Sequence, residues 1–423
     1  MTSLPPILFF TPDPPTALWQ DKPQIARRLA RLTPVLYVSE EPYLRPLLQA
    51  LRRGQAPPLT QPKLTSLAPG LYRFSWSPLA PVTGAPLLGA VTAALRHRRL
   101  QSALRWLQSS DQLSVIGDRS PTAEHCSPRT AHRSPILWLF RPGRQEWIDR
   151  LRPSLVVYHV VDEYSAYPNL SPAQAERQRE LDRRLTARAD LVFCTAQSLV
   201  EARRPLNPHT YYLPNAVDFE AFRGARPSPL LAHLPPPILG VVGGINAKVD
   251  LALLAEAARR RPAWTVALVG PLGYGLDPEE LAQLRSLPNV HFLGPVPPED
   301  APAVIAACDV GLIPYRLTEQ TRHVNPLKAY EYLAVGKPVV GTALPELAQF
   351  GDLVHIAAGQ WPEPGRPAGQ TDAESFIAAV EAALAEADDP DRAARRQAFA
   401  AANTWDHRVA RMVELLEAAI GER

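Results

Sequence analysis

The sequence predicts an α/β protein in which two domains each hold a largely parallel sheet. Short, continuous apolar runs recur along the whole chain and alternate with stretches of helical spacing. Strands covered by helices on both faces have this continuous apolar character. A length of 423 residues is also more than a single hydrophobic core usually serves. We therefore expect two domains in series, with ligands bound at the C-terminal strand ends in a cleft between them.

The first half of the chain opens with a strand, a helix and a second strand. The helical stretch covers residues 23–32. Apolar runs predict buried strands at 7–10, 35–38, 136–140, 155–161 and 191–194. Proline-rich connections occur at 57–62 and 78–86, and a proline-rich linker at 227–237 precedes the second half. The domain boundary belongs between the last of these strands and the end of the linker.

The second half repeats the pattern. Apolar runs predict strands at 238–242, 265–269, 290–293, 310–313, 338–340 and 353–356. Helical patterns, such as the one at 251–260, lie between them, and this alternation implies a parallel sheet with right-handed crossovers. A final helix is predicted at 405–420.

The segment 308–341 indicates a ligand type as well as a structure. Asn325 is a good N-cap, Pro326 suits the first helical position, and Gly336 suits the C-terminal stop. The helix start then lies beside a strand end, where unpaired N–H groups and the helix dipole favour an anion. Lys328 adds a cation in the first turn, and Glu331 follows one turn later. This arrangement suits a nucleotide diphosphate, with phosphates at the helix tip and ribose hydroxyls on the carboxylate.

The run NPLKAYEYLAVGKPVV at 325–340 resembles the donor-binding segment of the nucleotide-sugar-dependent glycosyltransferases of group 1 (family 4), which are retaining enzymes of the GT-B fold. The runs VVYHVVDEYSAYP and LPNAVDFEAF resemble the teichuronic-acid-type subgroup. The resemblance implies two Rossmann-like domains that face each other across a cleft. Residues 1–218 would form the acceptor-binding domain, 219–403 the donor-binding domain, and 404–423 a helix that crosses back onto the first domain.

The resemblance also implies roles in donor binding. Glu331 would hold the donor ribose, with Leu327 beside it in the same helix start. In the family another Glu precedes this position, with seven residues between the two, and His323 occupies that place here. His323 either reaches the sugar or phosphate or is an ordinary loop histidine. The family likewise has an Arg after the first glycine of its glycine-rich turn, where this chain has Gly244.

The Gly243-Gly244 turn is a second predicted donor contact. It follows an apolar run and lets a diphosphate approach the backbone, and Lys248 lies within reach of a phosphate. The alternative is a plain strand-to-helix turn with a solvated lysine. NAD binding is disfavoured because the third glycine of a dinucleotide fingerprint is absent.

His159 and Asp162 lie at the end of the strand predicted at 155–161, where an α/β sheet presents functional groups. Either could orient an acceptor hydroxyl or accept its proton, which makes both candidates for catalysis together with Lys248. The alternatives are a buried strand-end histidine and an aspartate that closes a turn.

Composition narrows the possible partners. The net charge of +3 argues against nucleic acid. The three cysteines lack metal spacing and predict neither disulfides nor a zinc site. Asp389 and Asp391 form a D-x-D sequence far from any predicted strand end, so we interpret them as a turn and expect no metal. The N-terminus lacks a signal peptide pattern, and a cytoplasmic protein is expected.

Two clusters of arginine among apolar residues indicate either peripheral contact with the inner face of the membrane or ordinary solvated helix faces. They contain Arg45, Arg52 and Arg53, and then Arg96, Arg98, Arg99 and Arg105.

The sequence thus favours a metal-independent glycosyltransferase without a cofactor, and the resemblance implies that it is a retaining enzyme. Its co-substrate would be a nucleotide-diphosphate sugar, and its acceptor a cell-envelope glycan, a lipid-linked glycan or a small molecule. A non-catalytic nucleotide-sugar-binding or scaffold protein on the same fold is the main alternative. A sugar-nucleotide epimerase is less favoured, because it would need more acid and base groups.

Overall fold

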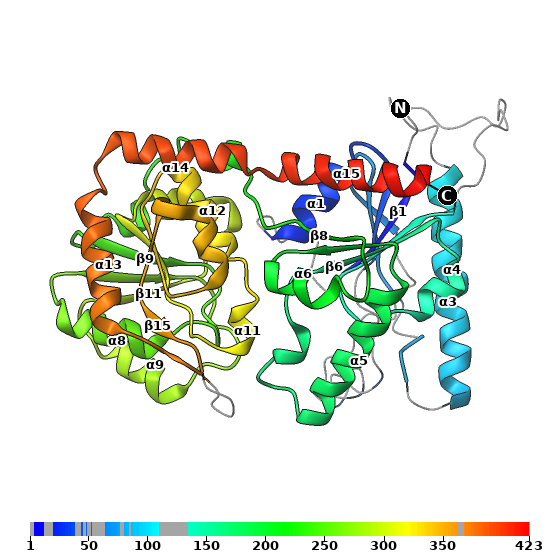
Figure 1. The fold of residues 1–423 in the computed structure, drawn as a ribbon, viewed down its shortest axis with the longest axis horizontal. Helices are drawn as coiled ribbons and strands as arrows, with labels where there is room; N and C mark the ends of the chain where they lie inside the picture. Colours follow the sequence, from blue (N-terminus) through cyan, green and yellow to red (C-terminus); the bar gives the residue numbers. More distant parts are fainter. Residues whose placement is uncertain are drawn as a thin grey trace.

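A computed structural model describes residues 4–11, 20–38, 64–76, 80–83, 86–109, 134–362 and 368–422, together with positions 44, 48 and 52. Arg45, Arg53, Cys126 and the proline-rich connection at 57–62 lie outside these residues, as do positions 78, 79, 84 and 85 of the connection at 78–86. The chain forms two α/β domains side by side. The helix α14 (Pro390–Ala402) runs along the second domain, and α15 (Trp405–Gly421) runs along the first (Figure 1).

The first domain is built on an eight-stranded sheet in the order β3-β4-β2-β1-β5-β6-β7-β8. Its strands are parallel except for the β3–β4 pair at one edge. They are β1 (Ile7–Phe10), β2 (Val35–Val38), β3 (Leu64–Ala68), β4 (Leu71–Phe74), β5 (Ile136–Leu139), β6 (Leu155–Val160), β7 (Leu191–Cys194) and β8 (Thr210–Tyr212). The five strands predicted for this half are therefore present, and the sequence analysis missed β3, β4 and β8.

Helices cover both faces of this sheet. The core on one face contains residues of α1 (Asp21–Leu29). The core on the other face contains residues of α3 (Pro86–Ser109), α4 (Glu146–Leu151), α5 (Pro172–Arg188) and α6 (Gln197–Arg203). Burial on both faces explains why the central strands are apolar at every position.

The second domain holds a six-stranded parallel sheet in the order β11-β10-β9-β12-β13-β14. Its strands are β9 (Ile238–Val242), β10 (Thr265–Val269), β11 (Val290–Gly294), β12 (Val310–Ile313), β13 (Val339–Gly341) and β14 (Val354–Ile356). All six were predicted, with ends that differ by one residue at most. A short antiparallel pair, β15 (Gly359–Gln360) and β16 (Gln370–Thr371), lies outside this sheet.

The core on one face of the second sheet includes residues of α10 (Ala301–Ala306), α12 (Leu327–Val335) and η4 (Pro345–Leu353), with Ala400 of α14 (Pro390–Ala402). The core on the other face includes residues of α8 (Leu251–Arg260), α9 (Pro278–Arg285) and α13 (Ala373–Ala385). Shorter helical segments are η1 (Tyr164–Ala166), α7 (Phe219–Phe222), η2 (Pro229–Leu231), η3 (Pro298–Asp300) and α11 (Glu319–Arg322).

The last helix, α15 (Trp405–Gly421), leaves the second domain and packs on the first (Figure 1). Five of its apolar side chains are buried in the same core as α1. Arg28 of α1 donates to Asp406 at 2.9 Å and reaches Asp218, before α7, at 3.3 Å. The helix therefore lies where the sequence analysis expected it. The residue boundaries 218/219 and 403/404 remain a proposal.

The chain passes between the domains twice, at one place. The N–H of Val217 donates to the carbonyl of Asn403, and the N–H of Trp405 donates to the carbonyl of Val217. The outgoing and returning segments are thus hydrogen-bonded to each other as a short parallel bridge between Val217 and Thr404.

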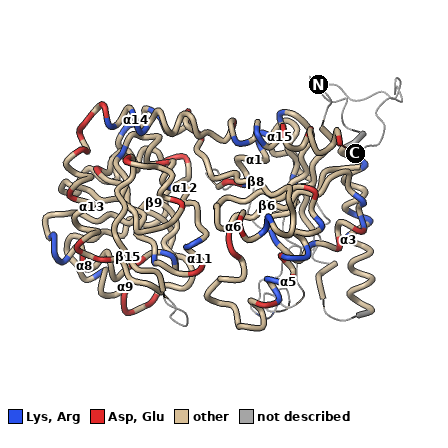
Figure 2. The backbone as a smooth tube through the Cα atoms, in the orientation of Figure 1, with Lys and Arg blue, Asp and Glu red and all other residues tan. Residues whose placement is uncertain are grey.

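Both signs of charge are spread over both domains (Figure 2), in line with the small net charge. Cys194 and Cys308 are buried and free, as expected of small apolar residues. Within the described residues, no helix combines the length and apolar composition that a bilayer crossing requires.

Candidate functional site

The helix α12 starts at Leu327, and Pro326 occupies the N-cap position without a side-chain cap. The prediction that Asn325 is the N-cap is therefore wrong. The Asn325 side chain is buried, accepts from the N–H of Asn215 at 3.2 Å and donates to Glu346 at 2.9 Å. These partners come from distant parts of the chain and occupy the amide, so the first N–H groups of α12 receive no cap from it.

Glu331 lies half-buried on α12, one turn beyond Lys328. Burial raises the pKa of its carboxyl group to about 7, against the opposing attraction of the Lys328 ammonium. Among the described residues its carboxylate has no hydrogen-bond partner. A carboxylate kept partly away from water without a partner is suited to accept hydrogen bonds from a ligand.

The Gly243-Gly244 turn follows β9 directly and faces Lys328. Gly243 has a φ of +115°, and a Cβ built there would lie only 2.6 Å from the Lys328 Nζ. The turn thus needs glycine at Gly243 for its conformation and for the close approach of the lysine. Gly244 has no such φ, and a Cβ there would meet only Asn246 at 3.9 Å. The backbone conformation that favours glycine therefore occurs at Gly243 and not at Gly244.

Tyr332 ties the helix that carries Lys328 and Glu331 to the strand that leads into this turn. Its buried hydroxyl accepts from the N–H of Val242 at 3.0 Å and donates to the carbonyl of Gly240 at 3.2 Å. Both partners belong to β9, immediately before Gly243. One side chain therefore fixes the distance between the turn and α12.

We expect Tyr332→Phe to lower the free energy of unfolding by about 1–3 kcal/mol, because the Val242 N–H would be buried without its partner. The same change should raise the KM for the nucleotide ligand several-fold by loosening α12 against the turn. Tyr330→Phe is the matched control, since that hydroxyl donates to Gln349 at 3.2 Å and does not contact β9. Equal KM values for the two variants would show that Tyr332 matters for folding alone.

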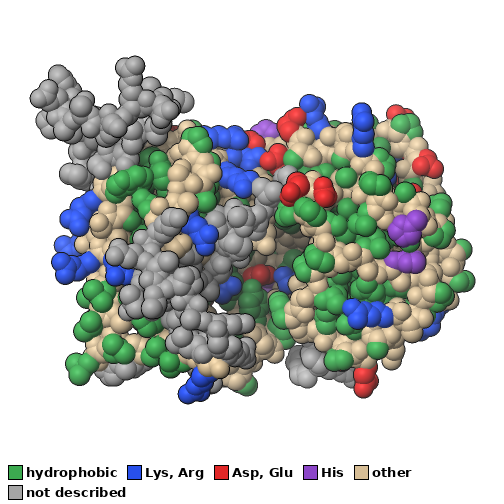
Figure 3. Space-filling model, turned by 180° about the vertical axis from the view of Figure 1, so that it is seen from behind, with side chains coloured by type: hydrophobic (Ala, Val, Ile, Leu, Met, Phe, Trp, Pro, Cys, Tyr) green, Lys and Arg blue, Asp and Glu red, His purple; other side chains and the backbone are tan. Residues whose placement is uncertain are grey.

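Lys248 contacts the other domain. Its Nζ lies 3.7 Å from the carboxylate of Asp162, which also accepts from the Tyr167 hydroxyl at 3.0 Å. Burial alone would lower the pKa of Lys248, but the attraction of Asp162 outweighs it, and the pKa is raised. The structure thus brings together two of the three predicted catalytic residues, one from each domain. Seen from behind, the surface is hollowed between the two lobes (Figure 3).

His323 and Leu327 also face the first domain. The His323 ring lies 2.8 Å from the Ser198 hydroxyl and 3.1 Å from the Glu319 carboxylate. Leu327 packs against the apolar core that contains α1 and α15. Their predicted roles in donor binding remain untested, while both side chains make contacts between the domains.

His159 lies inside the first domain. Its side chain is 1% exposed and stacks on Phe140 with ring centroids 5.0 Å apart. Burial, with a smaller contribution from Lys22, lowers its pKa to about 3, so the ring is neutral at pH 7. The structure therefore corrects the expected place of His159, because a ring enclosed by aromatic side chains cannot contact an acceptor in this conformation.

A buried glutamate of the second domain, which the sequence analysis missed, accepts hydrogen bonds from the first domain. Glu346 accepts from the Gln197 N–H at 2.7 Å, from the Tyr212 hydroxyl at 2.7 Å and from the Asn325 amide at 2.9 Å. Gln197 is the first residue of α6, which lacks a side-chain cap of its own. The second domain thus supplies an N-terminal acceptor to a helix of the first. No local sequence pattern reveals a cap that comes from so far along the chain.

Asp389 accepts from the N–H groups of Asp391 and Arg392 and caps α14, so the D-x-D sequence begins a helix where the sequence analysis expected a turn. Across the part of the chain that the structure describes, no three His, Cys, Asp or Glu side chains are grouped as metal ligands would be.

Comparison with known proteins gives this geometry a context. Residues 236–386 match the family of glycosyl transferases group 1. Over 244 residues the chain is 30% identical to a Bacillus subtilis (strain 168) protein described as the teichuronic acid biosynthesis glycosyltransferase TuaH, covering 55% of this chain and 61% of that protein. The chain thus spans about three fifths of the length of that relative.

Two solved structures share the fold over nearly the whole chain. Anabaena HepE in complex with UDP and glucose superposes with a TM-score of 0.56 at 18% identity, covering 97% of this chain and 99% of that one. A UDP-forming alpha,alpha-trehalose-phosphate synthase from Burkholderia vietnamiensis gives a TM-score of 0.60 at 11% identity, covering 99% of each chain. At these identities the likeness shows the fold, which is the predicted GT-B architecture.

Proposed function

We propose that this chain, whose residues 236–386 match the group 1 glycosyltransferase family, belongs to that family and transfers a sugar from a nucleotide-diphosphate sugar to an acceptor. The observation that carries the proposal is the convergence of Lys328, the uncapped start of α12 and the Gly243 turn, with the unpartnered carboxylate of Glu331 one helical turn away. This site offers positive groups to a diphosphate and an acceptor to ribose hydroxyls. UDP is the nucleotide we propose first, because the HepE relative was solved with UDP.

The proposed reaction gains its rate from charge stabilisation. Negative charge grows on the diphosphate as its bond to the anomeric carbon breaks, and the Lys328 ammonium and the N–H groups of α12 stabilise that charge. A fixed positive site of this kind can act without a metal ion, which we propose for this enzyme. Retention of the anomeric configuration is also proposed, from family membership.

The first domain would supply the acceptor side of the reaction. The diphosphate draws Lys248 away from Asp162. The freed carboxylate accepts the proton of the acceptor hydroxyl as that oxygen bonds to the anomeric carbon on the face from which the diphosphate departs, as retention requires. The likeness to a teichuronic acid enzyme supports a cell-envelope glycan or a lipid-linked glycan as the acceptor. We further propose that the protein works in the cytoplasm, at the inner face of the membrane.

A non-catalytic nucleotide-sugar-binding protein is the competing function. It is favoured by His323, which is engaged with Ser198 where the family has a glutamate, and by Gly244 where the family has an arginine.

We expect the purified protein to release UDP from at least one UDP-sugar in a panel of UDP- and GDP-sugars, with membrane lipid extract as the acceptor source. Slow hydrolysis should occur without acceptor, and EDTA should leave the rate unchanged. Asp162→Asn is the informative variant, because it should bind UDP like the wild type but turn over more slowly. If UDP binds and no donor in the panel is consumed, the protein is a nucleotide-sugar-binding protein and the proposed enzyme activity is wrong.

A further inference from the structure

The helix α3, on the outer side of the first domain, exposes an unusual face. The exposed residues in the first half of α3 are all apolar. Four of them are large: Leu87 is 87% exposed, Leu88 49%, Val91 58% and Leu95 39%. Exposed apolar residues grouped on one helix face indicate an interaction surface. The helix contains no Asp or Glu over its 24 residues.

Three of the four arginines of α3 take part in no ion pair among the described residues, and the fourth, Arg96, donates to the carbonyls of Ala80 and Pro81. These three are Arg98, Arg99 and Arg105. The neighbouring helix α5 shows what a solvated basic face looks like in this protein, because its Arg179, Arg183 and Arg184 all pair with Glu176 or Glu180. An ordinary solvated basic helix would carry acidic partners for its arginines, as α5 does. The helix α3 contains no such residues, which argues against that interpretation.

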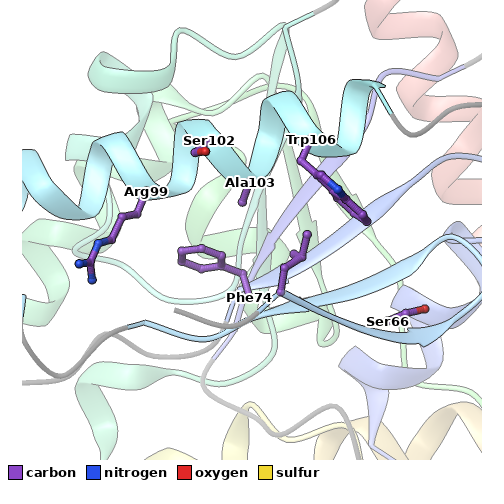
Figure 4. Close-up of a pocket in the computed structure, with 7 residues that line it drawn as sticks. Ser66, Phe74, Arg99, Ser102, Ala103 and Trp106 are labelled. Atoms are coloured by element: carbon purple, nitrogen blue, oxygen red, sulfur yellow. The ribbon is translucent and has the colours of Figure 1, made fainter. Parts of the chain in front are cut away.

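A pocket of about 560 Å³ lies where this face meets the edge of the sheet. In Figure 4 the Arg99 guanidinium lies at one end of the pocket and the Trp106 indole at the other, with Phe74 rising from β4 between them. The hydroxyl groups of Ser66 and Ser102 also line it. The Nη1 of Arg99 is buried and has no hydrogen-bond partner among the described residues.

The pocket and the apolar face form one continuous stripe. Leu88, Val91 and Leu95 are followed at intervals of three or four residues by Arg99, Ser102 and Trp106, which is the spacing of one helix face. Trp106 is 43% exposed, and an indole at such a border suits the boundary between lipid and water. A partner for this stripe needs apolar surface beside a single anionic group.

We propose that α3 docks on an anionic lipid bilayer and that the pocket at Arg99 receives the phosphate of one lipid headgroup. The apolar residues of the first turns enter the boundary of the acyl chains, Arg98 and Arg105 lie over neighbouring headgroups, and the Arg99 guanidinium pairs with the bound phosphate. The inference deepens the membrane placement proposed above. It needs no turnover assay, so its failure leaves the donor site untouched.

The test is binding of the full chain to sedimenting vesicles of phosphatidylglycerol or of phosphatidylcholine. We expect binding to phosphatidylglycerol alone, weakened by salt. Arg99→Gln should weaken it about tenfold, because it removes a charge-assisted pair in a partly enclosed site. Ser102→Trp, at an exposed helix position, should weaken it similarly by filling the pocket. Arg179→Gln on α5 is the matched control and should bind like the wild type.

Three outcomes would overturn the proposal: equal binding to both lipids, no binding to either, or wild-type binding by both Arg99→Gln and Ser102→Trp. The melting temperature of each variant without vesicles confirms that it is folded. If Arg99→Gln alone is weakened and Ser102→Trp is not, a diffuse basic surface replaces the headgroup pocket.

Discussion

Glu331→Gln is expected to remove most of the rise in melting temperature that saturating UDP gives the wild-type protein. A ligand that binds only the folded state at about a hundred times its dissociation constant adds roughly 2.7 kcal/mol of stability. Glu331 is the carboxylate placed behind the helix start, and glutamine replaces a charged acceptor by a weaker neutral one. Differential scanning fluorimetry with and without UDP measures the effect.

The same variant should be more stable than the wild type when no ligand is present, at high pH. Glu331 has a pKa of about 7 in the folded protein, above its ordinary value of 4.5. The folded state therefore binds the proton more tightly, and stability falls as pH rises from about 4.5 to 7. This loss of folding free energy is fully present above pH 7 and amounts to roughly 3 kcal/mol at most. Glu331→Gln should recover much of it at pH 8 and little at pH 4.5.

Glu417→Gln on α15 is the control, since this exposed glutamate should change neither quantity. If Glu331→Gln is folded and keeps the full UDP shift, Glu331 does not touch the nucleotide and the donor site lies elsewhere.

Lys328→Ala is expected to lower turnover about a hundredfold while hardly changing the free energy of unfolding. Its Nζ lies beside Gly243, where the leaving diphosphate would gain charge, and removing one preorganised positive group from such a position typically costs ~10²–10³ in rate. Steady-state kinetics of UDP release, with urea unfolding on the same samples, separates the two effects. Lys337→Ala, just beyond the other end of α12, should be unaffected.

Lys248→Ala addresses the contact of the second domain with Asp162 of the first. We expect a smaller loss, because the change also releases Asp162 from the ion pair that holds it in the free protein. Wild-type turnover in Lys328→Ala or in Lys248→Ala would remove that lysine from the mechanism.

The local sequence was sufficient for most of the fold. The central strands are buried on both faces, so their apolar runs carry the signal without interruption. The edge strands β3 and β4 were missed because they are partly exposed and mix polar with apolar residues. Strand β8 is only three residues long, which is too short to stand out by periodicity.

The donor side of the site was predicted better than the contacts between the domains. Lys328 and Glu331 lie one turn apart on one helix, so their spacing alone places them together. Asn325 and His323 are held by partners more than a hundred residues away in the sequence, and their local contexts predicted other roles. His159 lies near the end of a strand, as a functional residue would. The residue type alone did not predict that its side chain is buried among the aromatic residues of the core.

The two passages of the chain between the domains, bonded to each other at Val217 and Thr404, define how this molecule can open. Two separate connections would resist turning, whereas two bonded at one point act as a single hinge. Rotation about that hinge changes the distance between Lys248 and Asp162 without breaking either sheet. Opening and closing of the cleft therefore costs chiefly the contacts that cross it, which include the hydrogen bonds of Glu346 and His323 and the packing of Leu327. Substitutions at the hinge should alter kcat and KM together.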